Sequence, residues 1–262
     1  MHNPSELAKL QCFPAHCPLW RPDSKRTKYM TEPVTEASAR TKARLVGIFE
    51  ILEGLTSTYA QVIVFNSLVV SGNAAATASN ILAHELQLRL GFVACFIGIG
   101  FHIAWALLFY DLFRSVNRNV SFFGLLIIVV GCGIQALAGI FYVAPLFILT
   151  QGNSLSAFTT EQAQALAFTF VKLTGASFNA YLVFHGLWCV VSGYLIFKSR
   201  FLPKILGLLL MLNGFGWMTY LSPPLGNKLF PIIAIIATVE IPLPWFFIFG
   251  FNTQRWKEQV AR

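Results

Sequence analysis

The chain has 262 residues, of which 56% are hydrophobic, 15% aromatic and only 11% charged. Soluble domains carry about 25% charged residues, so this composition excludes an ordinary soluble protein and indicates an integral membrane protein. The net charge of +8 does not indicate nucleic-acid binding, because Lys and Arg stand at the ends of apolar runs rather than in one basic motif.

Residues 1–29 are polar and rich in Pro, without the continuous apolar core that a secretory signal peptide needs. We therefore interpret them as a disordered or spurious N-terminal extension. Cys12, His16 and Cys17 lie in this stretch, but their spacing matches no standard zinc pattern. Residues 30–43 then form a basic lead-in, which we expect on the cytoplasmic side of the membrane.

Six long apolar runs follow and predict six membrane-spanning helices. A helix rises about 1.5 Å per residue, so about 20 apolar residues cross a hydrocarbon core of about 30 Å. The runs are continuous rather than alternating, which argues against the strands of a β-barrel. They occupy residues 44–70, 90–113, 120–149, 175–197, 203–221 and 229–251. The sequence therefore predicts an all-α, polytopic membrane helical bundle over residues 44–251.

The basic residues predict how this bundle is oriented. The side that would hold both termini carries eleven Lys and Arg residues, whereas the opposite side carries only Arg89, Lys172 and Lys228. By the positive-inside rule, this predicts that both termini are cytoplasmic and that residues 252–262 form a cytoplasmic tail. We expect a multi-pass protein of the bacterial inner membrane. The eleven residues are Arg40, Lys42, Arg44, Arg114, Arg118, Lys198, Arg200, Lys204, Arg255, Lys257 and Arg262.

Two segments on the opposite side carry helix signals. Thr159 and Gln162 match a capping box, in which each side chain bonds the other residue's backbone N–H, so a helix is predicted to begin there. Residues 79–92, "SNILAHELQLRLGF", are typical of an amphipathic lead-in to the second span, with Asn80 as the N-cap.

Six segments spread over the chain carry a family resemblance. They are "TKARLVGIFEILEG", "NILAHELQLRLGF", "HIAWALLFYDLF", "LSAFTTEQAQALA", "FLPKILGLLLMLNGFGWMTYLSPPL" and "RWKEQ". Together they resemble the bacterial integral membrane family catalogued as domain of unknown function 4386, over residues 30–258. The resemblance implies an integral membrane protein with that family's fold. It implies no catalytic residues, substrate or cofactor.

Ionisable side chains inside the predicted spans are the main candidates for function, because a charge at mid-bilayer costs at least about 2.5 to 3.5 kcal/mol. Four of them come from four different spans and lie about 12 to 18 Å from the cytoplasmic helix ends, at 1.5 Å per residue. We expect these four to form a buried polar centre: Glu53, His102, His185 and Glu240. The supporting polar residues are Glu50, Gln135 and Asn179.

The first span carries two carboxyl groups about one helical turn apart, Glu50 and Glu53. Glu50 lies close to the cytoplasmic end, and we interpret it mainly as a partner of Lys42, Arg44 or headgroup water. Glu53 lies deeper, within reach of the histidine layer. A hydrogen bond to a neighbouring helix and a functional role both remain open for it.

The last span holds Glu240 in "IATVEIPLPWFF". Pro242 and Pro244 follow it, and because proline lacks a backbone N–H, they are expected to free carbonyl groups and kink the helix. The cysteines inside apolar runs are interpreted as small hydrophobic packing residues: Cys95, Cys132 and Cys189.

Three classes of function remain open for the polar centre. The first is a non-catalytic bundle that binds a lipid, a partner or a small effector, and we rank it first because it demands least of the sequence. The second is a small-molecule or proton-coupled carrier. The third is an intramembrane metal-dependent enzyme, with His102, His185 and a carboxylate as metal ligands. The metal, any cofactor and the small-molecule ligand are unknown. The expected partner is the lipid bilayer, no nucleic acid is expected, and a homo-oligomer is left open.

Overall fold

The computed structural model describes residues 36–150 and 158–261, and every regular element within these ranges is a helix. Six helical segments are long and apolar enough to cross a membrane, which confirms the predicted number of spans. They comprise Ser38–Leu68, Glu85–Phe113, Arg118–Thr150, Thr160–Lys198, Lys204–Leu221 and Pro223–Phe249. The interpretation of residues 1–29 as an extension lies outside the described residues.

The first span consists of three consecutive elements, α3 (Glu36–Thr58), the π-helix η2 (Tyr59–Phe65) and the short α4 (Asn66–Leu68). A π-helical turn is wider than an α-helical one and is often found at functional sites. The Ala60 carbonyl oxygen within it accepts a hydrogen bond of 3.1 Å from the Tyr142 hydroxyl group of the third span. The wide turn is thereby attached to a neighbouring helix.

A separate short helix, α5 (Ala74–Ala83), precedes α6 (Glu85–Phe113), so the predicted lead-in is not continuous with the second span. Asn73 caps α5, because its side chain accepts a backbone N–H bond of 2.9 Å from the first turn. The prediction that Asn80 caps the second span is wrong. Asn80 lies inside α5, and its side-chain amide donates to the Leu68 carbonyl oxygen.

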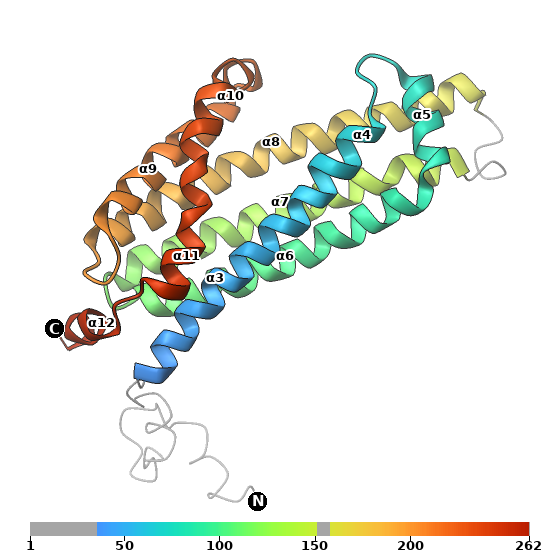
Figure 1. The fold of residues 1–262 in the computed structure, drawn as a ribbon. Coiled ribbons are helices and arrows are strands. Elements are labelled where there is room, and N and C mark those ends of the chain that lie inside the picture. Colours follow the sequence, from blue (N-terminus) through green and yellow to red (C-terminus); the bar gives the residue numbers. More distant parts are fainter. Residues whose placement is uncertain (1–35, 151–157, 262) are drawn as a thin grey trace, which may run out of the picture. The chain divides into compact units, whose positions relative to one another are not determined.

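The central packing involves α7 (Arg118–Thr150), α8 (Thr160–Lys198) and α9 (Lys204–Met218), with α8 in extended contact with both of the others. In Figure 1, α7 runs alongside α8 and α6 runs alongside α7, and α6 also packs on α3. The start of α8 confirms the predicted capping box, in which Thr159 and Gln162 each accept the other's backbone N–H. Through these contacts α8 joins the first three spans to the last two.

The sixth span is interrupted. Its first part, α10 (Pro223–Ala237), ends in the 3-10 turn η4 (Thr238–Glu240), and α11 (Pro242–Phe249) begins directly afterwards. Pro242 occupies the first turn of α11, where its fixed φ favours a helix start and its missing N–H costs nothing. The break that the prolines predict is therefore present, and it sets Glu240 at the end of a tight turn.

The C-terminal helix α12 (Thr253–Val260) packs against the ends of other helices rather than crossing the bundle. Trp256 is buried and donates its indole N–H to the Leu112 carbonyl oxygen at 3.1 Å. The Gln259 side chain accepts the backbone N–H of Arg200 at 3.1 Å. These contacts bring α12 together with the end of α6 and the α8–α9 connection.

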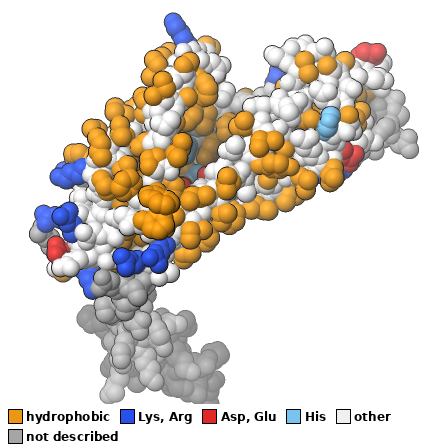
Figure 2. Space-filling view, viewed as in Figure 1, with side chains coloured by type: hydrophobic (Ala, Val, Ile, Leu, Met, Phe, Trp, Pro, Cys, Tyr) orange, Lys and Arg blue, Asp and Glu red, His pale blue; other side chains and the backbone are white. Residues whose placement is uncertain are grey.

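Basic side chains gather at this end of the bundle (Figure 2). Lys42 of α3 forms an ion pair with Asp111 of α6, and Arg114 pairs with the same carboxyl group at 2.9 Å. The α8–α9 connection adds Lys198 and Arg200. Basic residues from connections that are distant in sequence therefore lie at one end of the bundle. The predicted topology requires this, because every second connection between spans lies on the same side of the membrane.

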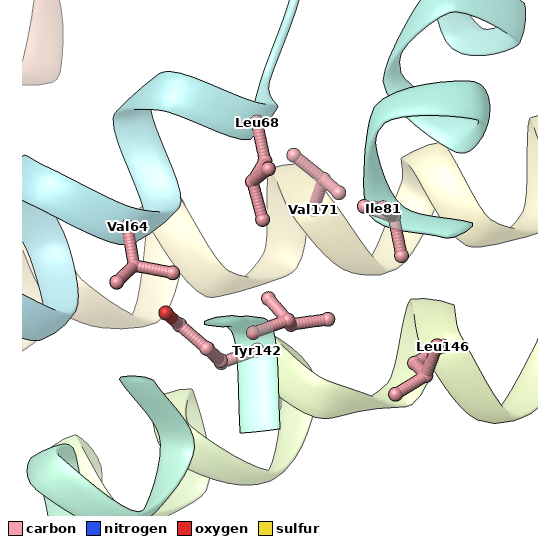
Figure 3. Close-up of a cluster of buried hydrophobic side chains, with 7 residues drawn as sticks. Val64, Leu68, Ile81, Tyr142, Leu146 and Val171 are labelled. Atoms are coloured by element: carbon pink, nitrogen blue, oxygen red, sulfur yellow. The ribbon is translucent and has the colours of Figure 1, made fainter. Parts of the chain in front are cut away.

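A cluster of buried apolar side chains packs the first span and α5 against α6, α7 and α8 (Figure 3). Tyr142 is fully buried within it, and its hydroxyl group is the one that bonds the π-helical turn. The cluster comprises Val64, Leu68, Ile81, Leu88, Tyr142, Leu146 and Val171. It fixes the part of the first span that forms one wall of the candidate site.

Candidate functional site

The four residues of the predicted polar centre lie on four different elements. Glu53 is on α3, His102 on α6, His185 on α8 and Glu240 at the end of η4. Packing of α3 on α6, of α8 on α9 and of η4 on α9 brings these elements together. The side chains meet in two pairs, which the two histidine rings connect.

The first pair is His185 and Glu240, with 3.3 Å between the imidazole Nε2 and the carboxyl Oε1. The same carboxyl oxygen accepts a hydrogen bond from the side-chain amide of Asn213, a fully buried residue of α9. Glu240 is therefore held by contacts from both α8 and α9, although its side chain remains 35% exposed.

The second pair, Glu53 and His102, is looser. The carboxyl Oε1 lies 3.7 Å from the imidazole Nδ1, which is too long for a hydrogen bond, and it accepts a bond of 2.9 Å from the Ser57 hydroxyl group. His102 is buried, and neither of its ring nitrogens has a hydrogen-bond partner among the described residues. Its ring stacks on Trp105, with centroids 4.9 Å apart, so ring packing is its main contact.

The two histidines meet edge to face. Their ring centroids lie 6.2 Å apart and their planes are inclined by 83°. The two histidines therefore interact by ring packing. The sequence suggested a metal site made of both histidines and a carboxylate, but these are not the potential ligands that lie closest together. Among the described residues, the group of potential ligands within 4.8 Å of one another is His185, Cys189 and Glu240.

Cys189 is the contact that the sequence interpretation missed. Its sulfur lies 3.5 Å from Nε2 of His185 and 3.9 Å from Oε1 of Glu240. His185 and Cys189 are four residues apart, which places them on one face of α8, and this spacing was the available signal. The thiol packs as a small side chain but does so against polar atoms.

Glu50 was expected to pair with Lys42, Arg44 or headgroup water, and the structure bears on the first of these. Lys42, one of its expected partners, pairs with Asp111 instead. The Oε2 atom of Glu50 is buried and accepts no hydrogen bond from the described residues. Glu50 therefore contributes an unpaired carboxyl oxygen to the neighbourhood of the polar centre.

Two adjoining cavities meet at the polar centre. The first, here called the vestibule cavity, measures about 550 Å³ and extends from the polar centre to Asn66 and Asn227, near helix ends. The second, the lateral cavity, measures about 540 Å³ and lies between α3 and the break that separates α10 from α11. The residues that line both cavities are Glu53, Gly54, Thr58, His185 and Glu240.

The supporting residues Gln135 and Asn179 both line the vestibule cavity. Gln135 is buried, and its side-chain oxygen has no hydrogen-bond partner among the described residues, whereas Asn179 is half-buried. Figure 2 shows acidic and histidine atoms at the bottom of a recess between apolar surfaces. Glu53, His185 and Glu240, which line both cavities, are thus reachable from outside the bundle, whereas His102 is buried.

Three carboxyl groups and the imidazole of His185 are the ionisable groups that dominate the cavity walls. Glu50, Glu53 and Glu240 line the cavities, and none of the lining residues that the structure describes is Lys or Arg. A carboxylate in a medium of low dielectric constant is stable only when a cation or a proton neutralises it. The arrangement is therefore suited to binding a cation or holding protons, and it is unsuited to an anionic ligand.

Comparison with known proteins gives one match. A family model described as domain of unknown function (DUF4386) matches residues 45–249, a range that includes the whole polar centre and Cys189. No curated protein and no solved structure matches the chain.

Proposed function

Since the chain belongs to the family described as domain of unknown function (DUF4386), whose description assigns no activity, we propose a function from the geometry of its polar centre. The protein is a multi-pass membrane protein that binds a small amphipathic cation, such as an alkyl amine, inside its helical bundle. This is a specific form of the first functional class, a bundle that binds a small effector.

The observation that carries this proposal is the set of three carboxyl groups lining the two cavities, with no Lys or Arg among the described lining residues. Glu50 and Glu53 stand about one turn apart on α3, and the buried Oε2 of Glu50 has no donor among the described residues. An ammonium group brings three N–H donors together with a positive charge. Binding such a group satisfies the unpaired oxygen and compensates the acidic side chains at once.

The cavity walls favour an apolar body attached to the cation. Trp188 lines the lateral cavity and Trp217 the vestibule cavity, and indole faces attract cations. At the mouth of the lateral cavity, Leu55 is 63% exposed and Ile241 is 76% exposed, so both offer apolar surface to a chain that lies in the bilayer. A cationic head with an alkyl chain suits these walls better than a hydrated inorganic ion does.

The proposal is tested with the full chain in nanodiscs of neutral phosphatidylcholine. Hexylamine is the probe, and hexanol and hexanoate are its uncharged and anionic counterparts. We expect hexylamine to quench or shift the tryptophan fluorescence saturably, because indole groups line both cavities. Glu53→Gln keeps the size of the side chain but removes the charge, and we expect it to weaken binding by at least about ten-fold, or about 1.4 kcal/mol.

Glu85→Gln is the matched control. Glu85 is an acidic residue at the start of α6 whose carboxyl group pairs with Arg89, and both side chains are nearly half exposed. We expect this variant to bind hexylamine as the wild type does. Equal binding of hexylamine and hexanol, or equal loss in both variants, would contradict the proposal.

A carrier for the same class of ligand is the second candidate. It is supported by the way the two cavities share the polar centre and by the position of Glu240 at a helix break, which resembles the discontinuous helices of transporters. Proteoliposomes distinguish the two candidates. A carrier moves labelled hexylamine into the lumen in a protein-dependent way, whereas a binding protein retains it only at the membrane.

We also propose the orientation and the location that the basic residues predict. Both termini are cytoplasmic, residues 30–43 and 252–262 lie on the cytoplasmic side, and residues 44–251 form the transmembrane domain of a bacterial inner-membrane protein. Support comes from the basic end of the bundle, where α12 contacts the end of α6 and the α8–α9 connection.

A further inference from the structure

We propose that His185, Cys189 and Glu240 form a binding site for one transition-metal ion of the Zn²⁺ class. The site goes beyond the proposed cation-binding function. It uses the imidazole, thiol and carboxyl groups on the α8 and η4 side of the cavities, whereas the amine is proposed to bind Glu50 and Glu53 of α3.

The separations of the three ligand atoms fit a tetrahedral ion. Zn–N and Zn–O bonds of about 2.0 to 2.1 Å and a Zn–S bond of about 2.3 Å, at tetrahedral angles, hold the ligand atoms about 3.3 to 3.6 Å apart. The observed separations are 3.3 Å for nitrogen to oxygen, 3.5 Å for sulfur to nitrogen and 3.9 Å for sulfur to oxygen. An ion can therefore be accommodated with shifts of a few tenths of an ångström.

The donor types select the class of metal. A thiolate, an imidazole and a carboxylate suit Zn²⁺, whereas Mg²⁺ and Ca²⁺ prefer oxygen ligands alone. The thiol loses its proton to solvent when it binds the metal. The thiolate of Cys189 and the carboxylate of Glu240 then balance the two charges of the ion, so the complex is neutral overall, which lowers the cost of placing it inside a membrane.

The fold holds all three ligands before a metal arrives. His185 and Cys189 lie one turn apart on α8, and the helix break at Pro242 sets Glu240 beside them. Asn213 donates its amide N–H to the Glu240 carboxyl group, a contact of the kind that orients metal-binding carboxylates. Three protein ligands leave a fourth position, and because His185 and Glu240 line both cavities, that position is accessible to water.

The site is tested by adding Co²⁺ to the full-length protein, purified in detergent with Cys12 and Cys17 replaced by Ser. Co²⁺ reports a sulfur ligand through a thiolate-to-metal charge-transfer band in the near ultraviolet. We expect one equivalent to bind and produce this band, one equivalent of Zn²⁺ to abolish it, and excess Mg²⁺ to leave it unchanged. In Cys189→Ser the band should disappear, and Zn²⁺ affinity should fall by at least about ten-fold.

Matched controls come from the other cysteines within the spans. Cys95 and Cys132 are also free and buried, so Cys95→Ser and Cys132→Ser test whether any intramembrane thiol produces the band. We expect both to retain it. His185→Gln tests the nitrogen ligand and should lower Zn²⁺ affinity as Cys189→Ser does. Elution of each variant as a single species in size-exclusion chromatography shows that it is folded.

The proposal is overturned if folded wild-type protein gives no thiolate band with Co²⁺, or if Cys189→Ser binds Zn²⁺ as tightly as the wild type. Failure here is distinguishable from failure of the proposed function. Glu53→Gln should keep the metal and lose hexylamine, whereas Cys189→Ser should lose the metal and keep hexylamine.

Discussion

His102 and His185 are both histidines inside spans, yet their surroundings differ. His185 has a carboxyl oxygen and a thiol sulfur within 3.3 and 3.5 Å of its Nε2 atom. His102 has no hydrogen-bond partner among the described residues for either nitrogen, and it stacks on Trp105. We infer that His185 acts through its nitrogen atom and that His102 acts mainly as an aromatic ring.

This contrast predicts the behaviour of His102→Phe. Phenylalanine keeps a flat ring against Trp105 and removes two buried nitrogens that have no hydrogen-bond partner in the described part of the chain, so the free energy of unfolding should change by less than about 1.5 kcal/mol. The Co²⁺ thiolate band should be unchanged. Thermal unfolding in detergent and the Co²⁺ spectrum check both expectations. Loss of the metal in this variant would instead make His102 a ligand.

The sequence indicated the candidate site only in part. Depth along the spans grouped Glu53, His102, His185 and Glu240, and the structure places these side chains near one another. The depth of a residue along its span does not say in which direction the side chain points, however. That direction depends on the rotation of the helix about its own axis, which is set by the helices packed against it. Cys189 was therefore interpreted as an apolar packing residue, although it shares a helix face with His185.

The α8–α9 contact is the element that most directly shapes the metal site. At two places the helices approach so closely that only glycine fits. A Cβ atom built on Gly186 would lie 2.6 Å from the Gly214 carbonyl oxygen, and one on Gly193 would lie 2.6 Å from the Gly207 carbonyl oxygen. This approach brings Asn213 of α9 to the ligands, because Gly186 and Gly214 are next to His185 and Asn213 in the sequence.

Gly186→Ala should therefore disturb both stability and metal binding. The added methyl group meets backbone atoms, which cannot rotate away, so the helices must separate and unfolding should become easier by about 1 to 3 kcal/mol. Zn²⁺ affinity should fall as the α9 contact with Glu240 loosens. Thermal unfolding in detergent and Co²⁺ titration measure the two effects.

Gly133→Ala is the control for this prediction. A Cβ atom at Gly133 would meet nothing within 4 Å, and alanine favours a helix by up to about 1 kcal/mol relative to glycine. We expect this variant to be at least as stable as the wild type and to bind Zn²⁺ normally. An equal loss of stability in both variants would show that helix packing at Gly186 is not the cause.

Element types followed directly from the sequence, because long apolar runs in a bilayer must satisfy their backbone groups as helices. The break at Glu240 was also predictable, because Pro242 lacks a backbone N–H. The π-helix at Tyr59–Phe65 was not, because no local sequence signal marks it, and the group that bonds its Ala60 carbonyl oxygen is the Tyr142 hydroxyl group of another span. Nor was the separation of α5 from α6, which occurs at His84, where the backbone leaves the helical conformation within a run that the sequence pattern continues.

At the scale of the whole molecule, the distribution of charge bears on the orientation in the membrane. An even number of spans places both ends of the chain on one side, whichever side that is. Lys42 and Arg114 share Asp111 at that end, and α12 packs there through Trp256. The connections at the other end, around Gly72 and Ser222, carry few basic residues. The positive-inside rule then predicts that the basic end faces the cytoplasm.

Single cysteines introduced at exposed positions test this assignment in cells. Ser71→Cys and Ser222→Cys lie in the connections opposite the basic end, and Glu258→Cys lies on the exposed face of α12. With Cys12 and Cys17 replaced by Ser, we expect a membrane-impermeant maleimide to label the first two in intact cells. It should label Glu258→Cys only after the membrane is inverted or permeabilised.

The native Cys95, Cys132 and Cys189 are buried and should stay unlabelled. Labelling of Glu258→Cys in intact cells would reverse the orientation. Labelling of position 222 from the cytoplasmic side would contradict the same assignment, because six spans place that connection opposite α12.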